Sequence, residues 1–382
     1  MNKIYSLNHS PIDFYFSQNP RDFIVREVPL YDFSNDGEHH ILNVRKKGLN
    51  TLEMIKIFSA ILGIKSNEIG YSGLKDKNAM TSQYISINKK FTQNLDSKLS
   101  LLEAKNIKIL SSTYHNNKLK IGHLKGNNFF IRLKKITPNI FEKINSVLKV
   151  IEKNGLPNYF GYQRFGKDGD NFLEGKKIIQ GELKLKNRKM NDFLISAYQS
   201  FLFNQWLSFR LKISKIFDSF EPQEILQALQ MQNLFDISEN HSSIQSLKIL
   251  DIAKIKAIKN QPFFFRLFEG DIMHHYPHGK AFELEIQNDI SRFYNKTITP
   301  TGLLSGEKVL NASSIAREIE SCFDDKLIKS PGARRFGWIW VENLKYNYIQ
   351  ENAWLELEFF LPKGSYATTL IEEIAHQNVK ID

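Results

Sequence analysis

The sequence predicts an α+β fold built from two domains. Strand-like segments dominate the first 150 residues and return near the end, whereas the middle is rich in helical patterns. At 382 residues the chain exceeds the about 250–300 residues at which a single hydrophobic core stops growing. The glycine patterns that bind dinucleotides or ATP phosphates are missing from the sequence, so a regular βα alternation around a nucleotide is not expected.

The N-terminal segment shows two strand signals and then a helix signal. Residues Phe23–Val28 and His40–Val44 are rich in apolar and β-branched residues, which favour strands. Thr51–Leu62 carries apolar residues at helical spacing, with Asn50 placed to cap its start and Gly63 just beyond its end. The segment therefore predicts two strands followed by an amphipathic helix.

Alternating patterns predict further strands on both sides of the middle region. Gln83–Ile87 and Lys118–Leu124 alternate like half-buried strands, and Phe129–Leu133 continues the pattern. Near the end Leu355–Phe359 alternates apolar residues with glutamates, and Tyr366–Ile374 has a helical pattern.

Helical spacing dominates the middle, in Asn191–Lys212 and again in Gln223–Gln230. A strand-rich start, a distinct middle and a strand-plus-helix end predict an inserted domain. The two ends of the chain would then build the other domain together.

Charge and cysteine content narrow the class of protein. Lysine and arginine outnumber the acids by 52 to 41, giving a net charge of +11. This excess favours a polyanionic partner through phosphate contacts and counterion release, although solubility alone is the alternative. Cys322 is the sole cysteine, which excludes an intrachain disulfide and a cysteine-based zinc site. With neither a signal-peptide core nor a membrane-length apolar run in the sequence, we expect a cytoplasmic protein.

The polar segment Gly70–Gln83 holds Asp76 between Lys75 and Lys77. Neighbouring cations favour the ionised form of an acid, so we expect Asp76 to be a carboxylate at neutral pH. An ionised aspartate in a basic loop can act as a nucleophile or a base. The other interpretation is a surface turn with solvated charges, and the pattern by itself favours that interpretation.

Two segments combine aromatic side chains with basic or amide groups. Leu124–Phe130 runs from a basic glycine turn into an aromatic strand, and Pro157–Gly166 sets aromatics beside Arg164 between two glycines. Such groups can stack on a base and bind its phosphate. Core packing explains the first segment more simply and the second equally well. The histidine run His274–His278 contains a proline and is interpreted as a surface turn, so no metal site is expected.

Short segments in a fixed order extend these observations along nearly the whole chain. They are Asp22-Phe23 with Glu27, Gly37–His39, Gly48–Thr51, Gly73–Ala79, Lys125–Asn127, Pro157–Gly166, Thr301-Gly302 and Leu361–Thr368. Each is weak alone, but in order and spacing together they resemble the TruD family of pseudouridine synthases.

The resemblance implies a pseudouridine synthase catalytic domain with a mixed, mostly antiparallel sheet, formed by residues 1–154 and 338–382. An inserted α/β TRUD domain would occupy residues 155–337. Asp76 falls on the family's catalytic aspartate, and Phe23, Asn127 and Phe129 fall on positions that bind the target uridine. The reaction exchanges no group or electron with a cofactor, so neither a cofactor nor a metal is expected.

The implied activity is the isomerisation of uridine 13 in transfer RNA, with glutamate tRNA as the expected substrate. The target base leaves its stack, at a cost of a few kcal/mol, and Asp76 acts as nucleophile or base. The implied partner is tRNA, with no membrane and no obligate protein partner evident. The alternative is a non-catalytic RNA-binding protein or RNA chaperone on the same fold. A metal-dependent nuclease would need clustered acids, and Asp76 is the only acid within its loop.

One position departs from the family pattern. The family often has a lysine six residues before Phe23, where it pairs with the catalytic aspartate, and this chain has Ser17. Either another cation serves Asp76, with Lys75, Lys77 and Arg164 open as candidates, or the activity is tuned differently.

Overall fold

The computed structural model describes residues 3–17, 19–166, 168–230 and 250–379, which divide into two compact units. The first, called the sheet unit, comprises the described parts of Pro11–Glu152, Val341–Ala367 and Gln377–Asp382. The second, called the helix unit, comprises the described parts of Met1–Ser10, Lys153–Trp340 and Thr368–His376. The assignment of a catalytic domain to residues 1–154 and 338–382, around an inserted domain at 155–337, stays a prediction.

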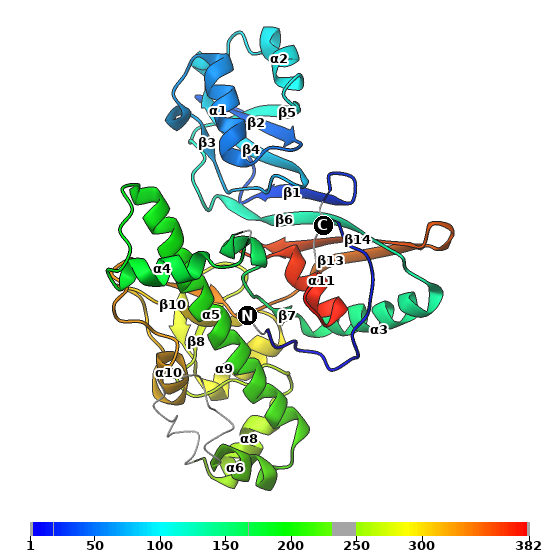
Figure 1. Ribbon diagram of the computed structural model, residues 1–382, viewed down its shortest axis with the longest axis vertical. Coiled ribbons are helices and arrows are strands. Elements are labelled where there is room, and N and C mark those ends of the chain that lie inside the picture. Colours follow the sequence, from blue (N-terminus) through cyan, green and yellow to red (C-terminus); the bar gives the residue numbers. More distant parts are fainter. Residues whose placement is uncertain (1–2, 18, 167, 231–249, 380–382) are drawn as a thin grey trace. The chain divides into compact units, whose positions relative to one another are not determined.

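The sheet unit is built on one mixed sheet (Figure 1). From edge to edge its strands are β13 (Glu342–Ile349), β14 (Trp354–Pro362), β6 (Leu124–Lys134), β1 (Phe23–Pro29), β4 (Met80–Asn88), β2 (His39–Lys46) and β5 (Ile107–His115). The short β3 (Gly70–Tyr71) also pairs with β4. Among the described strands of this sheet, only β1 and β4 pair in parallel. The predicted α+β class and mostly antiparallel sheet are confirmed.

Helix α1 (Thr51–Leu62) begins and ends where the sequence predicts. The side chain of Asn50 accepts a hydrogen bond from the Glu53 amide, and the Glu53 side chain accepts one from the Asn50 amide, which forms a capping box. Gly63 ends the helix in the left-handed conformation, at φ 71°. The apolar side of α1 packs on β2 and β4 in a cluster that includes Leu42, Met54, Phe58 and Ile85.

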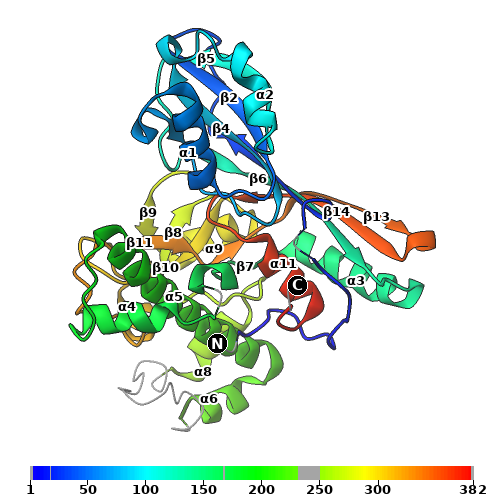
Figure 2. The same ribbon diagram turned by 45° about the horizontal axis from the view of Figure 1, so that its top comes forward.

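Two further helices complete the sheet unit. The short α2 (Leu99–Glu103) adds Leu102 to the same cluster. Helix α3 (Pro138–Asn154) lies beside β13 and β14 (Figure 2). Phe141 of α3 stacks on Tyr348 of β13 with ring centroids 4.6 Å apart, and the Tyr346 hydroxyl donates to Asn145 at 2.7 Å.

The pairing register decides which side chains share a face of the sheet. Side chains of directly paired residues lie on the same side, and the side alternates along each strand. Val25 pairs with both Thr81 and Phe129, and Thr81 pairs with Lys46. One face, called the α1 face, therefore carries Phe23, Glu27, Lys46, Thr81, Gln83, Asn127, Phe129, Phe359 and Leu361.

The prediction of a strand at Lys118–Leu124 is wrong. The chain turns there, and β5, which the sequence reading missed, precedes the turn. Gly122 adopts φ 93°, and its amide donates to the Ser72 carbonyl, while the Leu119 amide donates to the Ser86 hydroxyl. These bonds to neighbouring segments replace a strand ladder. The predicted basic turn at Lys125–Gly126 instead lies inside β6.

The helix unit combines helices with a smaller sheet. Its helices are α4 (Asn171–Ile179), α5 (Arg188–Ser219), α6 (Pro222–Gln230), α8 (Ile252–Lys259), α9 (Ile286–Tyr294), α10 (Ser314–Ser321) and most of α11 (Ala367–Ala375). The sheet runs β11 (Ala333–Phe336), β10 (Ile298–Leu304), β8 (Ile272–His275), β9 (Ala281–Glu283), and β7 (Leu156–Pro157) pairs with β12 (Trp338–Ile339). The predicted helices at Asn191–Lys212, Gln223–Gln230 and Tyr366–Ile374 are confirmed as α5, α6 and α11.

The histidine run differs from the predicted surface turn, because His274 and His275 belong to β8. Within the described parts of the chain, no helix is both long and apolar enough to cross a membrane.

Candidate active site

The segment 72–79 between β3 and β4, called the Asp76 loop, is held by its backbone. Lys46 donates to the carbonyl oxygens of Asp76, at 3.0 Å, and of Lys75, at 3.3 Å. The Lys75 amide donates to the Thr51 hydroxyl at 2.8 Å, and Gln83 donates to the Gly73 carbonyl at 3.4 Å. Because these bonds fix the main chain, the exposed side chain of Asp76 is presented from a rigid support.

Lys46 is a further candidate residue of this site that the sequence did not reveal. It is fully buried on the α1 face and also donates to the Leu49 carbonyl at 2.5 Å. Burial lowers the pKa of its ammonium group to about 8, although the charge of Asp76 opposes this shift. The available signal was the strand alternation of β2, which places a lysine on the same face as the buried Leu42 and Val44.

The lysines on either side of Asp76 have acidic partners of their own. The Lys75 ammonium lies 2.6 Å from the Glu27 carboxylate, and both side chains are buried. Glu27 also accepts a bond from the Tyr84 amide at 3.3 Å. Lys77 reaches Glu53 at 3.2 Å on the surface. The buried pair joins the Asp76 loop to β1, and the exposed pair joins it to α1.

The expectation that Asp76 is a carboxylate at neutral pH stays a prediction, because the adjacent cations are not the largest influence on its pKa. The surrounding protein desolvates the carboxyl group and raises its pKa above the usual value, and this effect outweighs the opposing charges of Lys46 and Lys75. A desolvated carboxylate is a stronger base and is held less by water, which suits either proton abstraction or nucleophilic attack.

Two positions from the sequence reading have other local partners. Arg164 lies in the 3-10 turn Tyr162–Phe165 of the helix unit, where its guanidinium donates to Ser196 at 2.5 Å and Ser200 at 3.0 Å. The Ser17 hydroxyl accepts a bond from Asn19 at 3.2 Å. Among the candidate cations, the charge of Lys75 acts on Asp76, together with that of Lys46.

The three predicted uridine-binding residues share the α1 face. Phe23 and Phe129 stack with ring centroids 6.3 Å apart and planes 10° apart, and Phe129 also stacks on Phe359 at 5.4 Å. Phe23 is 3% exposed and Phe129 6% exposed, so in this state the rings offer a base little more than their edges. Asn127 pairs with Glu27 across β1 and β6, which places it beside the anchor of the Asp76 loop.

Two polar atoms on this face lack a partner within the part of the chain that the structure describes. They are Oδ1 of Asn127 and Oγ1 of Thr81, and both are buried. A buried polar atom without a hydrogen bond costs about 1–3 kcal/mol, so such atoms are rare unless a ligand or water completes them. Both lie on the face to which Lys46 and the Glu27–Lys75 pair hold the Asp76 loop.

Comparison with solved structures identifies the class of protein. A crystal structure of a provisionally assigned tRNA pseudouridine synthase D (TruD) from Methanosarcina mazei matches with a TM-score of 0.57 and 23% identity. The match covers 98% of this chain and 96% of that one. The chain therefore has the fold of a TruD-type pseudouridine synthase.

Comparison of the amino-acid sequence with known proteins identifies the family to which the chain belongs. A protein named tRNA pseudouridine synthase D from Helicobacter pylori strain J99 is 51% identical over 379 residues, covering 98% of this chain and 96% of the relative. A relative of the same name from Wolinella succinogenes is 49% identical, and the match covers all of both chains. The family model described as tRNA pseudouridine synthase D (TruD) matches residues 2–186 and 295–374. The chain belongs to the TruD family.

Proposed function

We propose that this chain is a tRNA pseudouridine synthase that isomerises uridine 13, with glutamate tRNA as a substrate and Asp76 as the catalytic residue. The observation that carries the proposal is the Asp76 loop. Its backbone is fixed by Lys46 and Thr51, and the surrounding protein desolvates the Asp76 carboxyl group enough to raise its pKa. Membership of the TruD family supports the reaction.

The chemistry requires a carboxylate and little else. The bond between C1′ and N1 of the uridine breaks, the uracil turns, and C1′ joins C5. C5 then loses a proton and N1 gains one, so the reaction is balanced without a cofactor. Asp76 can add covalently to the nucleotide or abstract a sugar proton, and a raised pKa favours either role.

The unpaired atoms on the α1 face suit the edge of a uracil ring. Uracil presents both carbonyl acceptors and an N–H donor. The carboxamide oxygen of Asn127 can accept from that N–H, and the Thr81 hydroxyl can donate to a carbonyl. Phe23 and Phe129 would close the apolar side of the flipped base with their edges.

The net charge of +11 supports a nucleic-acid substrate, because each neutralised phosphate strengthens binding. The proposed site of action is the cytoplasm, where tRNA is processed. Lys75 and Lys77 are assigned to loop support through Glu27 and Glu53. Arg164 stays a proposed RNA contact.

The test uses glutamate tRNA transcribed without modifications. The tRNA is incubated in EDTA with wild type, Asp76→Asn or Glu68→Gln, and pseudouridine is mapped by carbodiimide adducts and primer extension. Glu68 is an exposed acid of the same region, and its substitution removes the same charge. We expect a stop at position 13 with wild type and Glu68→Gln but not with Asp76→Asn.

Other outcomes separate the alternatives. A stop elsewhere would keep the synthase and reject position 13. Absence of adducts with all three proteins, while each still binds the tRNA, would reject the enzyme and favour a non-catalytic RNA-binding protein. Activity that EDTA abolishes would reject the cofactor-free reaction.

A further inference from the structure

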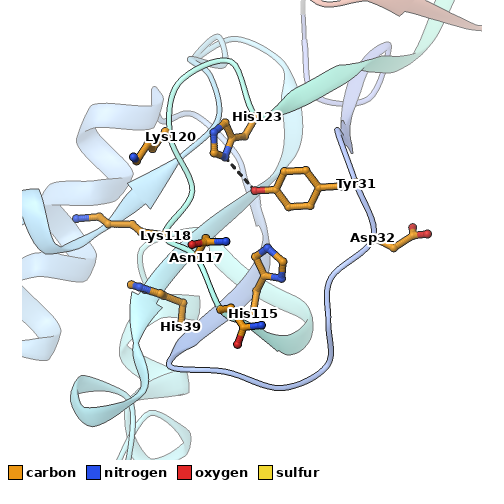
Figure 3. Close-up of a pocket in the computed structure, with 9 residues that line it drawn as sticks. Tyr31, Asp32, His39, His115, Asn117, Lys118, Lys120 and His123 are labelled. Atoms are coloured by element: carbon orange, nitrogen blue, oxygen red, sulfur yellow. Dashed lines mark hydrogen bonds between the residues drawn. The ribbon is translucent and has the colours of Figure 1, made fainter.

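A pocket of about 630 Å³ lies within the sheet unit (Figure 3). Its lining comes from three stretches of chain that meet at one end of the sheet. Tyr31 follows β1, His39 begins β2, and the segment from His115 to His123 connects β5 to β6. The turn that replaces the expected strand at Lys118–Leu124 therefore forms one wall of this pocket.

The pocket is separate from the Asp76 loop. Strand β2 begins at His39, in the pocket wall, and ends at Lys46, which holds the loop. Eight residues of extended strand place these two ends about 23 Å apart. A ligand in the pocket therefore does not contact the reacting nucleotide.

The centre of the pocket is aromatic. Tyr31 stacks on His115 with ring centroids 5.1 Å apart and planes 29° apart, and its hydroxyl bonds Nδ1 of His123 at 2.9 Å. Figure 3 shows the Tyr31 ring between these two histidines. A planar ring held by its neighbours is a ready surface for stacking a nucleobase, since little rotamer freedom is lost on binding.

Positive charge borders this aromatic centre. Lys118 and Lys120 line one side, and Asp32, the acid in the lining, points away from the Tyr31 ring (Figure 3). Lys118 is held by a hydrogen bond from its ammonium group to the Asn67 carbonyl. Both lysine side chains extend away from the Tyr31 ring in Figure 3, so their positive charge lies at the rim of the pocket. A positively charged rim next to an aromatic ring is the combination with which proteins hold single-stranded nucleic acid.

One buried atom of the lining lacks a partner. Nδ1 of His39 is buried and makes no hydrogen bond within the described residues. Burial, followed by the charges of Lys118 and His115, lowers the pKa of His39, while Glu38 opposes this shift. A metal is a poor candidate for the missing partner, since no three His, Cys, Asp or Glu side chains among the described residues are grouped to hold one. A polar group of an organic ligand fits better.

We propose that this pocket binds one unpaired nucleotide of the RNA substrate, with its base stacked on Tyr31 and its phosphate beside Lys118 and Lys120. His39 would bond the sugar or the base edge. This inference rests on the proposed function, because it takes the RNA to be the substrate of the Asp76 site. The pocket would fix the position of the RNA while the target uridine is modified about 23 Å away.

The test measures affinity and chemistry separately, with full-length protein and the unmodified glutamate tRNA transcript. Tyr31→Ala should weaken tRNA binding by about 5–150-fold, the loss typical of one stacked base. Tyr31→Phe keeps the ring, loses the bond to His123, and should bind within a few-fold of wild type. The single-turnover rate at saturating enzyme is measured for both variants, so that a loss of affinity is separated from a loss of chemistry.

Salt dependence tests the phosphate contact. Lys118→Ala/Lys120→Ala should lower the slope of log affinity against log salt by about 0.7–0.9, as expected for the loss of one neutralised phosphate. The matched control is Lys143→Ala/Lys149→Ala, which removes two exposed lysines from α3 of the same unit. Circular dichroism checks the fold of each variant. If Tyr31→Ala does not fold, the salt dependence of Lys118→Ala/Lys120→Ala tests the proposal instead.

The outcomes distinguish this inference from the proposed function. Wild-type affinity for both Tyr31→Ala and the lysine pair, or equal losses for the α3 control, would overturn it. UMP or inorganic phosphate at millimolar concentration that displaces the tRNA only from proteins with an intact pocket would assign the pocket to a free nucleotide or phosphate instead. If wild type binds through Tyr31 but forms no pseudouridine, the pocket stands and the enzyme proposal fails.

Discussion

The buried ammonium group of Lys46 donates a hydrogen bond to the main-chain carbonyl of Asp76, 3.0 Å away. The same ammonium group donates to the carbonyls of Lys75 and Leu49. One side chain therefore holds both the segment that follows β2 and the Asp76 loop. Lys46 holds the loop from beneath and acts on the Asp76 carboxyl group by its charge.

Lys46→Met should lower the rate of pseudouridine formation far more than the affinity for tRNA. Without the three donors the Asp76 loop shifts, and a displacement of about 1 Å can cost about 100-fold in rate. Single-turnover rates and tRNA affinity measure the two effects. Lys47→Met, which removes the exposed neighbouring lysine, is the control. In wild type the rate should also fall as pH rises through about 8, where Lys46 loses its charge, and an unchanged profile would contradict this role.

Thr81→Val should separate folding from substrate binding. The Thr81 hydroxyl is buried without a partner in the described chain, so its replacement by a methyl group should leave the unfolding free energy unchanged or raise it by about 1 kcal/mol. If the hydroxyl bonds the uracil, kcat/KM should still fall about 10-fold, because one lost hydrogen bond is worth about 1.4 kcal/mol. Denaturant unfolding and steady-state kinetics give the two numbers. Unchanged kinetics would remove Thr81 from the site.

Breaking the buried pair of Glu27 and Lys75 should destabilise the sheet unit. The two groups lie 2.6 Å apart with side-chain exposures of 0% and 5%, so removing one partner leaves an uncompensated buried charge. Such a loss costs about 3–5 kcal/mol, and Glu27→Gln should show it in denaturant unfolding. The double variant Glu27→Leu/Lys75→Met should regain most of this stability. A double variant as unstable as Glu27→Gln would mean that the hydrogen bond from the Tyr84 main-chain amide to Glu27 contributes more to stability than the charge pair does.

Local signals predicted most elements of the sheet unit. The Asn50 cap, the period of Thr51–Leu62 and Gly63 each indicate the same helix, so α1 was predicted to the residue. The strand prediction for 118–124 is wrong although the residues do alternate. Two amides of this segment donate to Ser72 and Ser86, which are distant in sequence, and not to a neighbouring strand. Strand β5 was missed because much of it is polar and exposed.

The sequence predicts which type of residue the candidate site contains, but it does not predict the pKa shift of Asp76 or the cation that acts on it. Asp76 stands out as a carboxylate in a glycine-bearing loop. Its raised pKa depends on how much protein surrounds it, and its cation Lys46 lies thirty positions earlier on another strand. Only the pairing of β2 with β4 brings these segments together.

Gly126→Ala should disrupt the pairing of β6 with β14. A Cβ at this position would lie 2.2 Å from the Leu361 carbonyl oxygen and 2.5 Å from the Phe360 ring. Because the first of these contacts is with backbone, the strands must separate, at a cost of at least about 1–3 kcal/mol. Thermal unfolding measures the loss, and Gly122→Ala is the contrast, since its Cβ would meet nothing within 4 Å but would be strained at φ 93°. Equal stability of Gly126→Ala and wild type would mean that β14 moves freely.

Glu373 of α11 gives the helix unit a pH-dependent stability. Its carboxylate accepts bonds from the Ser6 amide at 3.0 Å and the Ser6 hydroxyl at 3.2 Å, and it is buried. Burial raises its pKa from 4.5 to about 7 in the folded protein. The folded state therefore holds the proton more tightly than the unfolded state, so this group's contribution is favourable below pH 4.5 and is lost as pH rises to 7.

Glu373→Gln should therefore be more stable than wild type above pH 7, by roughly 3 kcal/mol at most, and similar to it near pH 4.5. Glutamine keeps an acceptor for Ser6 and removes the buried charge. Melting temperatures from pH 5 to 8 measure the difference. Glu372→Gln, which breaks the neighbouring 2.5 Å pair with Lys3, should give no gain at pH 8. A difference between Glu373→Gln and wild type that stays constant across this range would show that Glu373 keeps one protonation state in the folded protein.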